Sequence, residues 1–462
     1  MKQNKLYLYG ITLVAVLGGL LFGYDTAVIS GAEQALEEFF LSAKDFTYTK
    51  FYHGLTSSSA LIGCVIGACI SGFFVNSIGR KNSLFVASVL FFISALGSFN
   101  PEFLFFPQGE ASFDLLIAFN IYRVIGGIGV GLASAVCPMY IAEIAPADIR
   151  GKLVSWNQFA IIFGMLVVYF VNYLIKNSLP TQDAMVTIGW RRMFLSEAVP
   201  AALFGLLVIF VPKTPRFLVL KGKEEKALSV LERINGSIKA REILDEIKNT
   251  TEVKSSKLFS FGFKVVLVGM LLSFFQQAIG INVVLYYAPR IFENMGATGD
   301  IAMIQTVAMG FVNIVFTLVA VFTVDKWGRK PLLIVGSTGM MLGMIAIGIL
   351  SFSGSLGIVA LIAIVVYTAS FMMSWGPICW VLISEIFPNT IRGKAVAIAV
   401  AVQWIANYTV SSTFPMLSEW NIGGTYLIYG FFCLLSAIFV WKMVPETKGK
   451  SLEDMTKIWK KQ

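Results

Sequence analysis

The sequence predicts an all-α membrane protein in which twelve transmembrane helices form two bundles of six. The first observation is composition: 56% of the 462 residues are hydrophobic and 14% are charged, with a mean hydropathy of +0.76. Soluble proteins carry about 25% charged residues. The second is a series of apolar segments long enough to cross a bilayer, which requires about 20 residues. The third is a set of charged motifs that occurs once in each half of the chain.

Twelve apolar segments follow one another along the chain, and each is predicted to be a transmembrane helix from its length and hydropathy. The first is too long, and too polar at its end, for a cleaved signal peptide, and no small-residue cleavage site follows it. The predicted helices span residues 8–30, 54–76, 83–99, 115–140, 154–175, 193–212, 263–288, 302–323, 331–352, 357–383, 394–415 and 425–444.

The longest charged connection divides these segments into six and six. It covers residues 213–262 and includes two helix-like runs, 224–234 and 240–247. We therefore expect an N-terminal six-helix bundle over residues 1–212 and a cytoplasmic helical linker over 213–262. A C-terminal six-helix bundle with a short cytoplasmic tail is expected over 263–462.

The distribution of basic residues predicts the orientation in the membrane. Lys and Arg concentrate in the cytoplasmic loops of membrane proteins. With both termini in the cytoplasm, most of the 36 Lys and Arg residues fall on the cytoplasmic side or at its boundary, so both termini are expected inside. The net charge of +9 then reflects this rule and contact with anionic lipid rather than nucleic acid. The expected outer loops contain only Lys44, Lys50, Lys176, Arg191, Arg192 and Arg290.

Cysteine and histidine give no sign of a metal centre or a cofactor. All five cysteines lie in apolar segments, where they are expected to be small core residues, so neither a disulfide nor a metal site is predicted. The single histidine, His53, stands at the outer end of the second segment, where an interfacial residue is favoured over a proton relay. No nucleotide-binding loop is found, which argues against an ATP-driven pump.

A polar stretch interrupts the seventh apolar segment. Gln276, Gln277 and Asn282 fall broadly on one side of a helix, and Tyr286 follows one turn later. Buried amides without partners cost about 1–3 kcal/mol each, and amides both donate and accept, as sugar hydroxyls do. The pattern favours a wet cavity for an uncharged, hydroxyl-rich ligand. The alternative is that these amides only join neighbouring helices.

Two unlike charges lie inside predicted helices of the N-terminal bundle. Asp25 is in the first segment and Arg123 is in the fourth. A lone charge at the membrane centre costs at least about 2.5–3.5 kcal/mol, so the two are expected to pair. A pair that opens and closes would change the proton affinity of Asp25, as a proton-coupling site requires; the alternative is a permanent structural pair. Glu197, near the outer start of the sixth segment, is a further candidate that could instead reach outer water.

Charged motifs recur at matching places in the two halves. Gly-Arg-Lys follows the second and the eighth segments, and Glu-x6-Arg follows the fourth and the tenth. Two halves of the same orientation imply a pseudo-two-fold axis along the membrane normal and a substrate site between the halves. Glu143 is expected to pair with an arginine such as Arg80 or Arg150, and Glu385 with Arg329 or Arg392. These pairs would lock the halves together on the cytoplasmic side when the cavity opens outward; the alternative is simple solvation. The predicted gate residues are Arg80, Glu143, Arg150, Asp325, Arg329, Glu385 and Arg392.

These motifs resemble those of the sugar porters of the major facilitator superfamily. The resemblance also rests on Pro-x-x-Pro-Arg at 212–216, Pro-Glu-Thr-Lys-Gly at 445–449, and Gly-Tyr-Asp-Thr-Ala-Val-Ile-Ser-Gly at 23–31. It covers nearly the whole chain and implies the major facilitator fold. One departure is Asn76, where the second half has Asp325 and the family usually has an acid.

The resemblance adds residues to the expected sugar site. Trp380 follows Gly376-Pro377, which is expected to break its helix and let it bend as a gate. Asn407 is a weaker candidate. Met165 departs from the family, which has a sugar-contacting glutamine there, and a thioether cannot donate a hydrogen bond. The site residues implied in this way are Phe22, Met165, Asn313, Trp380, Gln403 and Trp404.

The resemblance implies a transporter rather than an enzyme. We expect import of a monosaccharide, a pentose or hexose with D-xylose favoured, by proton symport, without a cofactor. The chain is expected to be a monomer in a cell membrane, the inner membrane of a bacterium. A proton-independent uniporter and a sugar-binding membrane sensor are the alternatives.

Overall fold

The computed structural model describes residues 4–103, 109–146, 149–250, 257–354, 356–388, 391–448 and 459. Every regular element in these residues is helical, which confirms the all-α fold. The N-terminal half holds α1 (Lys5–Leu41), α2 (Lys50–Ser77), α3 (Arg80–Phe99), α4 (Phe113–Ile144), α5 (Arg150–Asn177), α6 (Gln182–Ala184), the π-helix η1 (Met185–Gly189), α7 (Trp190–Ser196) and α8 (Ala198–Phe210).

The remaining helices form a linker and a second half. The linker holds α9 (Pro215–Leu220), α10 (Glu224–Asn235) and α11 (Ser237–Thr250). The C-terminal half holds α12 (Phe263–Ala278), α13 (Ile281–Tyr286), α14 (Ala288–Asn294), α15 (Gly299–Trp327), α16 (Arg329–Phe352), α17 (Ile358–Met372), α18 (Trp375–Glu385) and α19 (Arg392–Met443).

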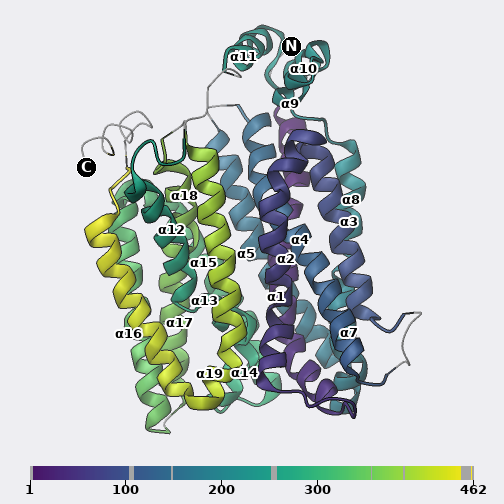
Figure 1. The fold of residues 1–462 in the computed structure, drawn as a ribbon, viewed down its shortest axis with the longest axis vertical. Helices are drawn as coiled ribbons and strands as arrows, with labels where there is room; N and C mark the ends of the chain where they lie inside the picture. Colours follow the sequence, from purple (N-terminus) through teal and green to yellow (C-terminus); the bar gives the residue numbers. More distant parts are fainter. Residues whose placement is uncertain are drawn as a thin grey trace.

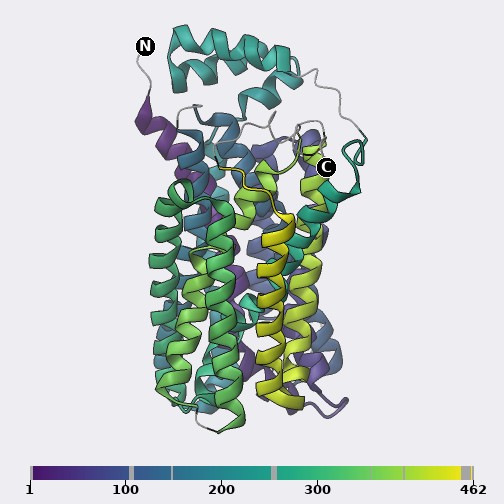
Figure 2. The same ribbon diagram turned by 90° about the vertical axis from the view of Figure 1, so that its left-hand side faces the viewer.

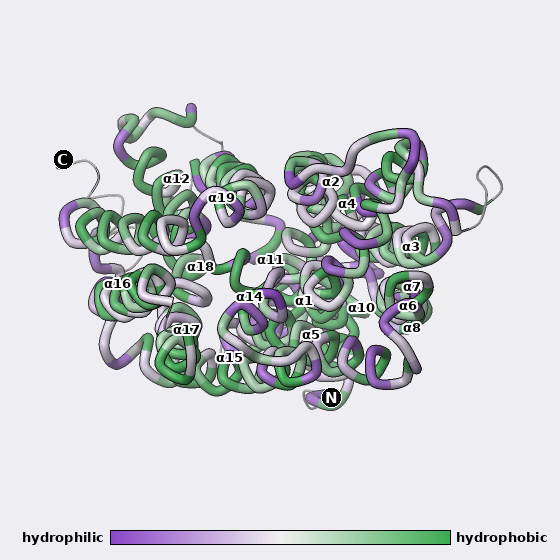
Figure 3. Tube along the Cα trace, turned by 90° about the horizontal axis from the view of Figure 1, so that it is seen from below, coloured by the Kyte–Doolittle hydropathy of each residue, from purple (hydrophilic) through white to green (hydrophobic). Residues whose placement is uncertain are grey.

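The two halves stand side by side, and the linker helices lie at one end of the molecule, over the N-terminal half (Figures 1 and 2). We call the end that carries α9–α11 the linker end, and the opposite one the far end. Hydrophobic residues predominate along the membrane-length helices, and polar residues gather in connections at the far end (Figure 3). The halves meet where α5 packs on α15 and where α2 packs on α19.

Eleven helical stretches in the described residues are long and apolar enough to cross a membrane. The last, α19, has 52 residues and is two crossings, because Asn421 leaves helical geometry with φ −165° and ψ 104°. The Asn421 side chain accepts a hydrogen bond from the Gly424 N–H at 2.7 Å and so caps the second part. The ribbon turns back on itself there (Figure 1). The expected twelve crossings are therefore confirmed.

Two predicted helices are interrupted. The seventh, expected as one helix over 263–288, breaks at Gly280, whose φ of +88° suits glycine alone. A β-carbon there would also lie 2.8 Å from the Tyr429 ring. The tenth breaks at Met373 and Ser374, before the predicted Gly376-Pro377. Pro377 lies in the first turn of α18, where its missing N–H costs little.

Glycines let α2 and α4 approach closely in the N-terminal half. A β-carbon on Gly127 would lie 1.8 Å from the Ala60 carbonyl oxygen, and one on Gly63 would lie 2.0 Å from that of Val124. These atoms belong to backbone, which cannot move aside as a flexible side chain can. Small residues of this kind are what permits close helix packing in membranes.

Gly127→Leu is therefore expected to separate α2 from α4 and to destabilise the protein by at least about 1–3 kcal/mol, the usual cost of overpacking. Melting of the purified variant measures the loss. Gly72→Leu is the matched control, because nothing lies within 4 Å of a β-carbon at that position. Equal melting temperatures for the two variants would contradict the close packing inferred for α2 and α4.

Candidate functional site

A chain of amide hydrogen bonds joins three helices inside the C-terminal half. Asn282 on α13 donates to Gln277 on α12 at 2.5 Å, and Gln277 donates to Gln276 at 3.0 Å. Gln403 on α19 donates to the same Gln276 oxygen. The Gln276 nitrogen donates to the carbonyl oxygen of Trp375, at 3.2 Å, where α18 begins. The helix breaks at Gly280 and Ser374 thus place both segments within reach of Gln276.

Several buried polar atoms of this half have no hydrogen-bond partner among the described residues. They are both amide atoms of Asn313, the Gln403 side-chain oxygen and the Trp404 indole N–H. Asn313 is 1% exposed, so water at the molecular surface does not satisfy it. Buried polar groups are normally paired. Donors and acceptors left open in this way are what a hydroxyl-rich ligand requires.

Other predicted site residues are placed as follows. The Phe22 ring of α1 lies 5.6 Å from the Trp404 ring, which brings the two halves into contact. Asn407 donates to the Tyr286 hydroxyl at 3.5 Å, so the weaker candidate does adjoin the predicted face. Trp380 is half-buried on α18. It makes no hydrogen bond or ring contact with the amide chain in the described residues.

Met165 is buried on α5, the helix that packs against both α1 and α15. The close approach of α1 and α5 depends on Gly23, because a β-carbon there would lie 1.9 Å from the Ile161 carbonyl oxygen and 3.1 Å from the Met165 nitrogen. With 8% of its surface exposed, Met165 does not face lipid.

The predicted charge pair forms in the N-terminal half. Arg123 donates to the Asp25 carboxylate at 2.6 Å and to the Asp25 carbonyl oxygen at 3.0 Å. Asp25 is 0% exposed and Arg123 is 3% exposed. The guanidinium also lies over the Phe194 ring, 4.9 Å from its centre. A cation over an aromatic face is stabilised by the ring quadrupole.

Glu197 completes this charged group instead of reaching outer water, which corrects the alternative considered from the sequence. It is 0% exposed, and neither of its carboxyl oxygens has a donor in the part of the chain that the structure describes. The second carboxyl oxygen of Asp25 also lacks a partner among the described residues, and the two carboxyl groups are electrostatic neighbours. Two carboxylates are both acceptors, so one proton between them would supply the missing hydrogen bond. One proton would also make the buried group of three neutral.

The repeated motifs pair within each half at the linker end. Arg80 on α3 contacts Glu143 on α4 at 2.7 Å, and Arg329 on α16 contacts Glu385 on α18 at 3.1 Å. The partners are those expected from the sequence, but each pair lies within one half and does not itself join the two halves. In the described residues, ion pairs between the halves are found at the far end. A lock between the halves at the linker end, in another conformation, stays a prediction.

The other predicted arginines of the gate, Arg150 and Arg392, donate to backbone carbonyl oxygens. Arg150 donates to the carbonyl oxygen of Ala145, and Arg392 donates to that of Phe387. Asp325 lies in α15, and its side chain is outside what the structure describes. Glu446, from the final motif, accepts the backbone N–H groups of Arg329 and Lys330. Burial raises the pKa of Glu446, but such backbone donors outweigh burial and hold it below its ordinary value.

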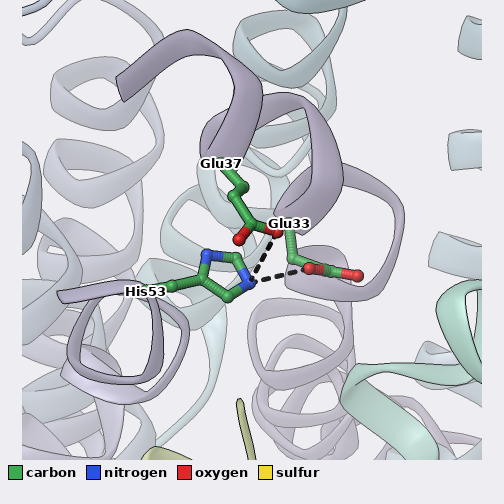
Figure 4. A group of neighbouring side chains, drawn as sticks. All are labelled: Glu33, Glu37 and His53. Carbon is green, nitrogen blue, oxygen red and sulfur yellow. Dashed lines mark hydrogen bonds and ion pairs between the residues drawn. The ribbon is translucent and has the colours of Figure 1, made fainter. Parts of the chain in front are cut away.

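A cluster at the far end was missed by the sequence interpretation. His53 is 1% exposed rather than interfacial, and its Nε2 lies 2.9 Å from the Glu33 carboxylate. Arg290, from α14 in the other half, contacts Glu33 at 2.7 Å. Figure 4 shows His53 between the two α1 carboxylates. We call this group the far-end cluster: its members are Glu33, Glu37, Lys50, His53 and Arg290.

Two membrane-embedded helical halves, with a buried amide network in one and a buried charge group in the other, define a carrier of small polar solutes rather than a soluble enzyme. The family model described as "Sugar (and other) transporter" matches residues 11–459. The chain therefore belongs to the sugar transporter family, the sugar porters of the major facilitator superfamily.

The chain is similar to several characterised relatives. It is 51% identical to the D-xylose-proton symporter of Escherichia coli K12, over 99% of this chain and 97% of that protein. It is 38% identical to the glucose facilitated diffusion protein of Zymomonas mobilis, over 98% and 97%. The inward-open structure of the xylose transporter XylE from E. coli matches with a TM-score of 0.88 at 50% identity, covering 98% of this chain and all of that one.

Proposed function

We propose that this protein imports a monosaccharide together with a proton by alternating access. The observation that carries the proposal is the buried group of Asp25, Arg123 and Glu197, which can be neutral only with one proton on its two carboxyls. Charges inside a membrane protein mark ion or proton pathways. The similarity to a D-xylose-proton symporter supports a pentose or hexose substrate, with D-xylose favoured.

Proton binding couples to conformation through Arg123. In the described state Arg123 pairs with Asp25. In the proposed mechanism the proton then resides on Glu197. A proton placed on Asp25 removes the charge that holds Arg123, which can then pair with Glu197. Each exchange moves Arg123 between helices α1 and α7–α8. A change in a buried pair of this kind can bias the two halves toward one opening or the other.

The sugar is bound by the amide chain and by the open polar atoms beside it. The side chains of Gln276 and Gln277 each contain an NH2 donor and a carbonyl acceptor. The Trp404 side chain offers its indole N–H as a donor and its ring as a flat apolar face. Tryptophan rings stack on the apolar face of a sugar ring. Phe22 reaches the same tryptophan from the N-terminal half, so a bound sugar would contact both halves.

In the proposed topology the protein lies in the inner membrane of a bacterium. Its linker end and both termini face the cytoplasm. It is supported by the scarcity of Lys and Arg in the connections at the far end. We further propose that residues 1–212 and 263–462 move as two bodies joined by the linker 213–262. A monomer surrounded by lipid suffices, because each half contributes to one shared pathway.

Uptake by vesicles containing the purified protein tests the proposed function. Labelled D-xylose, L-arabinose and D-glucose are offered with and without an imposed inward proton gradient. We expect the gradient to drive accumulation of at least one sugar above its external concentration. Equilibration without accumulation would identify a uniporter, and binding without uptake would identify a sensor.

Met165→Gln is expected to tighten D-xylose binding about three- to tenfold. The new amide would add one hydrogen bond, worth about 0.5–1.5 kcal/mol net, at the helix that separates α1 from α15. Calorimetric titration, together with the melting temperature, measures the effect, and Leu166→Gln is the neighbouring control. Unchanged or weaker affinity with normal melting would remove Met165 from the site.

A further inference from the structure

The far end of the protein is held closed by contacts between the two halves. Arg290 in α14 donates to Glu33 in α1 at 2.9 Å through its Nε, and it also contacts Glu37 in the same helix. Gln34 donates to Glu293, and Lys176 lies 3.7 Å from Asp300. The Arg290 contacts are the most buried of these, because Glu33 is fully buried whereas Asp300 is exposed. Opening this end must break them.

The charges of the closed cluster balance while His53 is neutral. The two carboxylates, Glu33 and Glu37, are matched by Arg290 and by Lys50, which pairs with Glu37. His53 and Arg290 both contact the same oxygen, Oε2 of Glu33, so they lie within two hydrogen-bond lengths of each other. A proton on His53 in this state would therefore place a third cation beside two anions.

Opening reverses this balance. Glu33, Glu37, Lys50 and His53 all belong to the N-terminal half, whereas Arg290 leaves with the other half. The carboxylates of Glu33, which is fully buried in the closed state, and of Glu37, which is half-buried there, then face one lysine, and the group is short of one positive charge. A proton on His53 restores neutrality, and an unpaired charge in a buried place is costly. His53 therefore binds a proton more tightly in the open state than in the closed one.

The surroundings of His53 accommodate both forms of its ring. Nδ1 lies 3.3 Å from the Tyr48 hydroxyl. Burial raises the pKa of Tyr48 above its ordinary value, so this hydroxyl stays protonated and can donate to neutral histidine or accept from the cation. The ring of Tyr287 packs against His53 from the other half. Asp114 on α4 and Glu419 on α19 are at the same end, and among the described residues no ion pair joins either of them to the cluster.

We propose that the far-end cluster is a proton-sensitive latch that holds the two halves closed at this end and releases when its histidine is protonated. This inference rests on the proposed transport function, because in that function the far end faces the outside of the cell. Imidazole titrates near pH 6.5 in model peptides. An acidic exterior would open the protein toward the side from which sugar and protons enter. This latch is separate from the charge group of Asp25.

Distances between spin labels at the far end test the latch without a transport assay. Labels on Leu41→Cys and Ile301→Cys report the two halves, because these side chains are 59% and 48% exposed. Cys69, the exposed native thiol, is replaced by serine, and the other cysteines are buried. We expect the ratio of long to short distances to rise on acidification from pH 7.5 to 5.5. A tenfold difference in proton affinity between the states changes that ratio up to tenfold.

The variants separate the latch from other titrating groups. His53→Gln keeps a donor for Glu33 but cannot titrate, so its pH response should be lost. Tyr48→Phe removes the acceptor for the protonated ring, so the response should move to lower pH. Arg290→Gln should favour the long distance at every pH. Lys176→Gln is the matched control, because its exposed pair contributes little.

A full pH response in well-folded His53→Gln, or a short distance at all pH values in Arg290→Gln, would overturn the latch. Asp25→Asn is measured beside them. A response that disappears in Asp25→Asn and persists in His53→Gln would assign the effect to the proton-coupling group, which also contradicts the latch. The outcome is independent of the transport assay, so failure of the latch leaves proton symport unaffected.

Discussion

Asp25→Asn is expected to abolish accumulation of sugar against its gradient while downhill movement continues. In the variant, Arg123 can pair only with the Glu197 carboxylate, and this pair is neutral without an exchangeable proton. One proton entering across 100 mV supplies about 2.3 kcal/mol, which is roughly fiftyfold accumulation at 1.4 kcal/mol for each factor of ten. The variant should fall from this value to equal concentrations on both sides.

Labelled sugar in vesicles with an imposed proton gradient measures this change. Asp183→Asn is the matched control, because Asp183 is an exposed aspartate in α6. Exchange of labelled for unlabelled sugar, without a gradient, shows that the Asp25 variant still binds and moves its substrate. Continued concentration of sugar by Asp25→Asn would remove the coupling role from Asp25.

Gln276→Ala is expected to weaken sugar binding by tenfold to a hundredfold. Gln276 accepts from Gln277 and Gln403 and donates to the first residues of α18. Its loss removes one amide from the proposed sugar site and releases Gln277 and Gln403 from the positions in which it holds them. About two hydrogen bonds to the sugar would be lost, each worth about 0.5–1.5 kcal/mol net. The remaining amide side chains would then change position beside the helix breaks at Gly280 and Ser374.

Calorimetry on the purified variant, with its melting temperature, separates lost affinity from lost fold. Gln158→Ala is the matched control, because Gln158 is a half-buried glutamine outside the amide chain, near the start of α5. A similar loss of affinity in both variants would show that the amide chain is not the sugar site.

The number of crossings and the charged pairs of the N-terminal half could be predicted because they depend on local signals. Apolar length predicts a membrane helix, and an aspartate and an arginine inside two such helices predict a pair. The exact positions at which the transmembrane helices are interrupted could not be predicted. Pro377 suggested a break at itself, whereas the backbone departs from helix at Ser374 and leaves proline in a tolerated first-turn position.

The partners of the polar residues depend on contacts between distant segments. Gln276 and Gln277 are adjacent in sequence, but the bond from Gln403 spans 127 positions. Glu33 and Glu37 lie one helical turn apart, and this i, i+4 spacing was a readable sign of a shared acidic face. Their partner Arg290 lies 257 positions from Glu33, and no local pattern predicts it.

The most direct measurement of the central claim is the external pH when sugar is added to de-energised vesicles with the far end outward. Symport carries protons inward with the sugar, so D-xylose should make the weakly buffered exterior more alkaline in proportion to uptake. Asp25→Asn should transport downhill without any pH change. Sugar uptake by the unmodified protein with no alkalinisation would contradict proton symport and identify a uniporter.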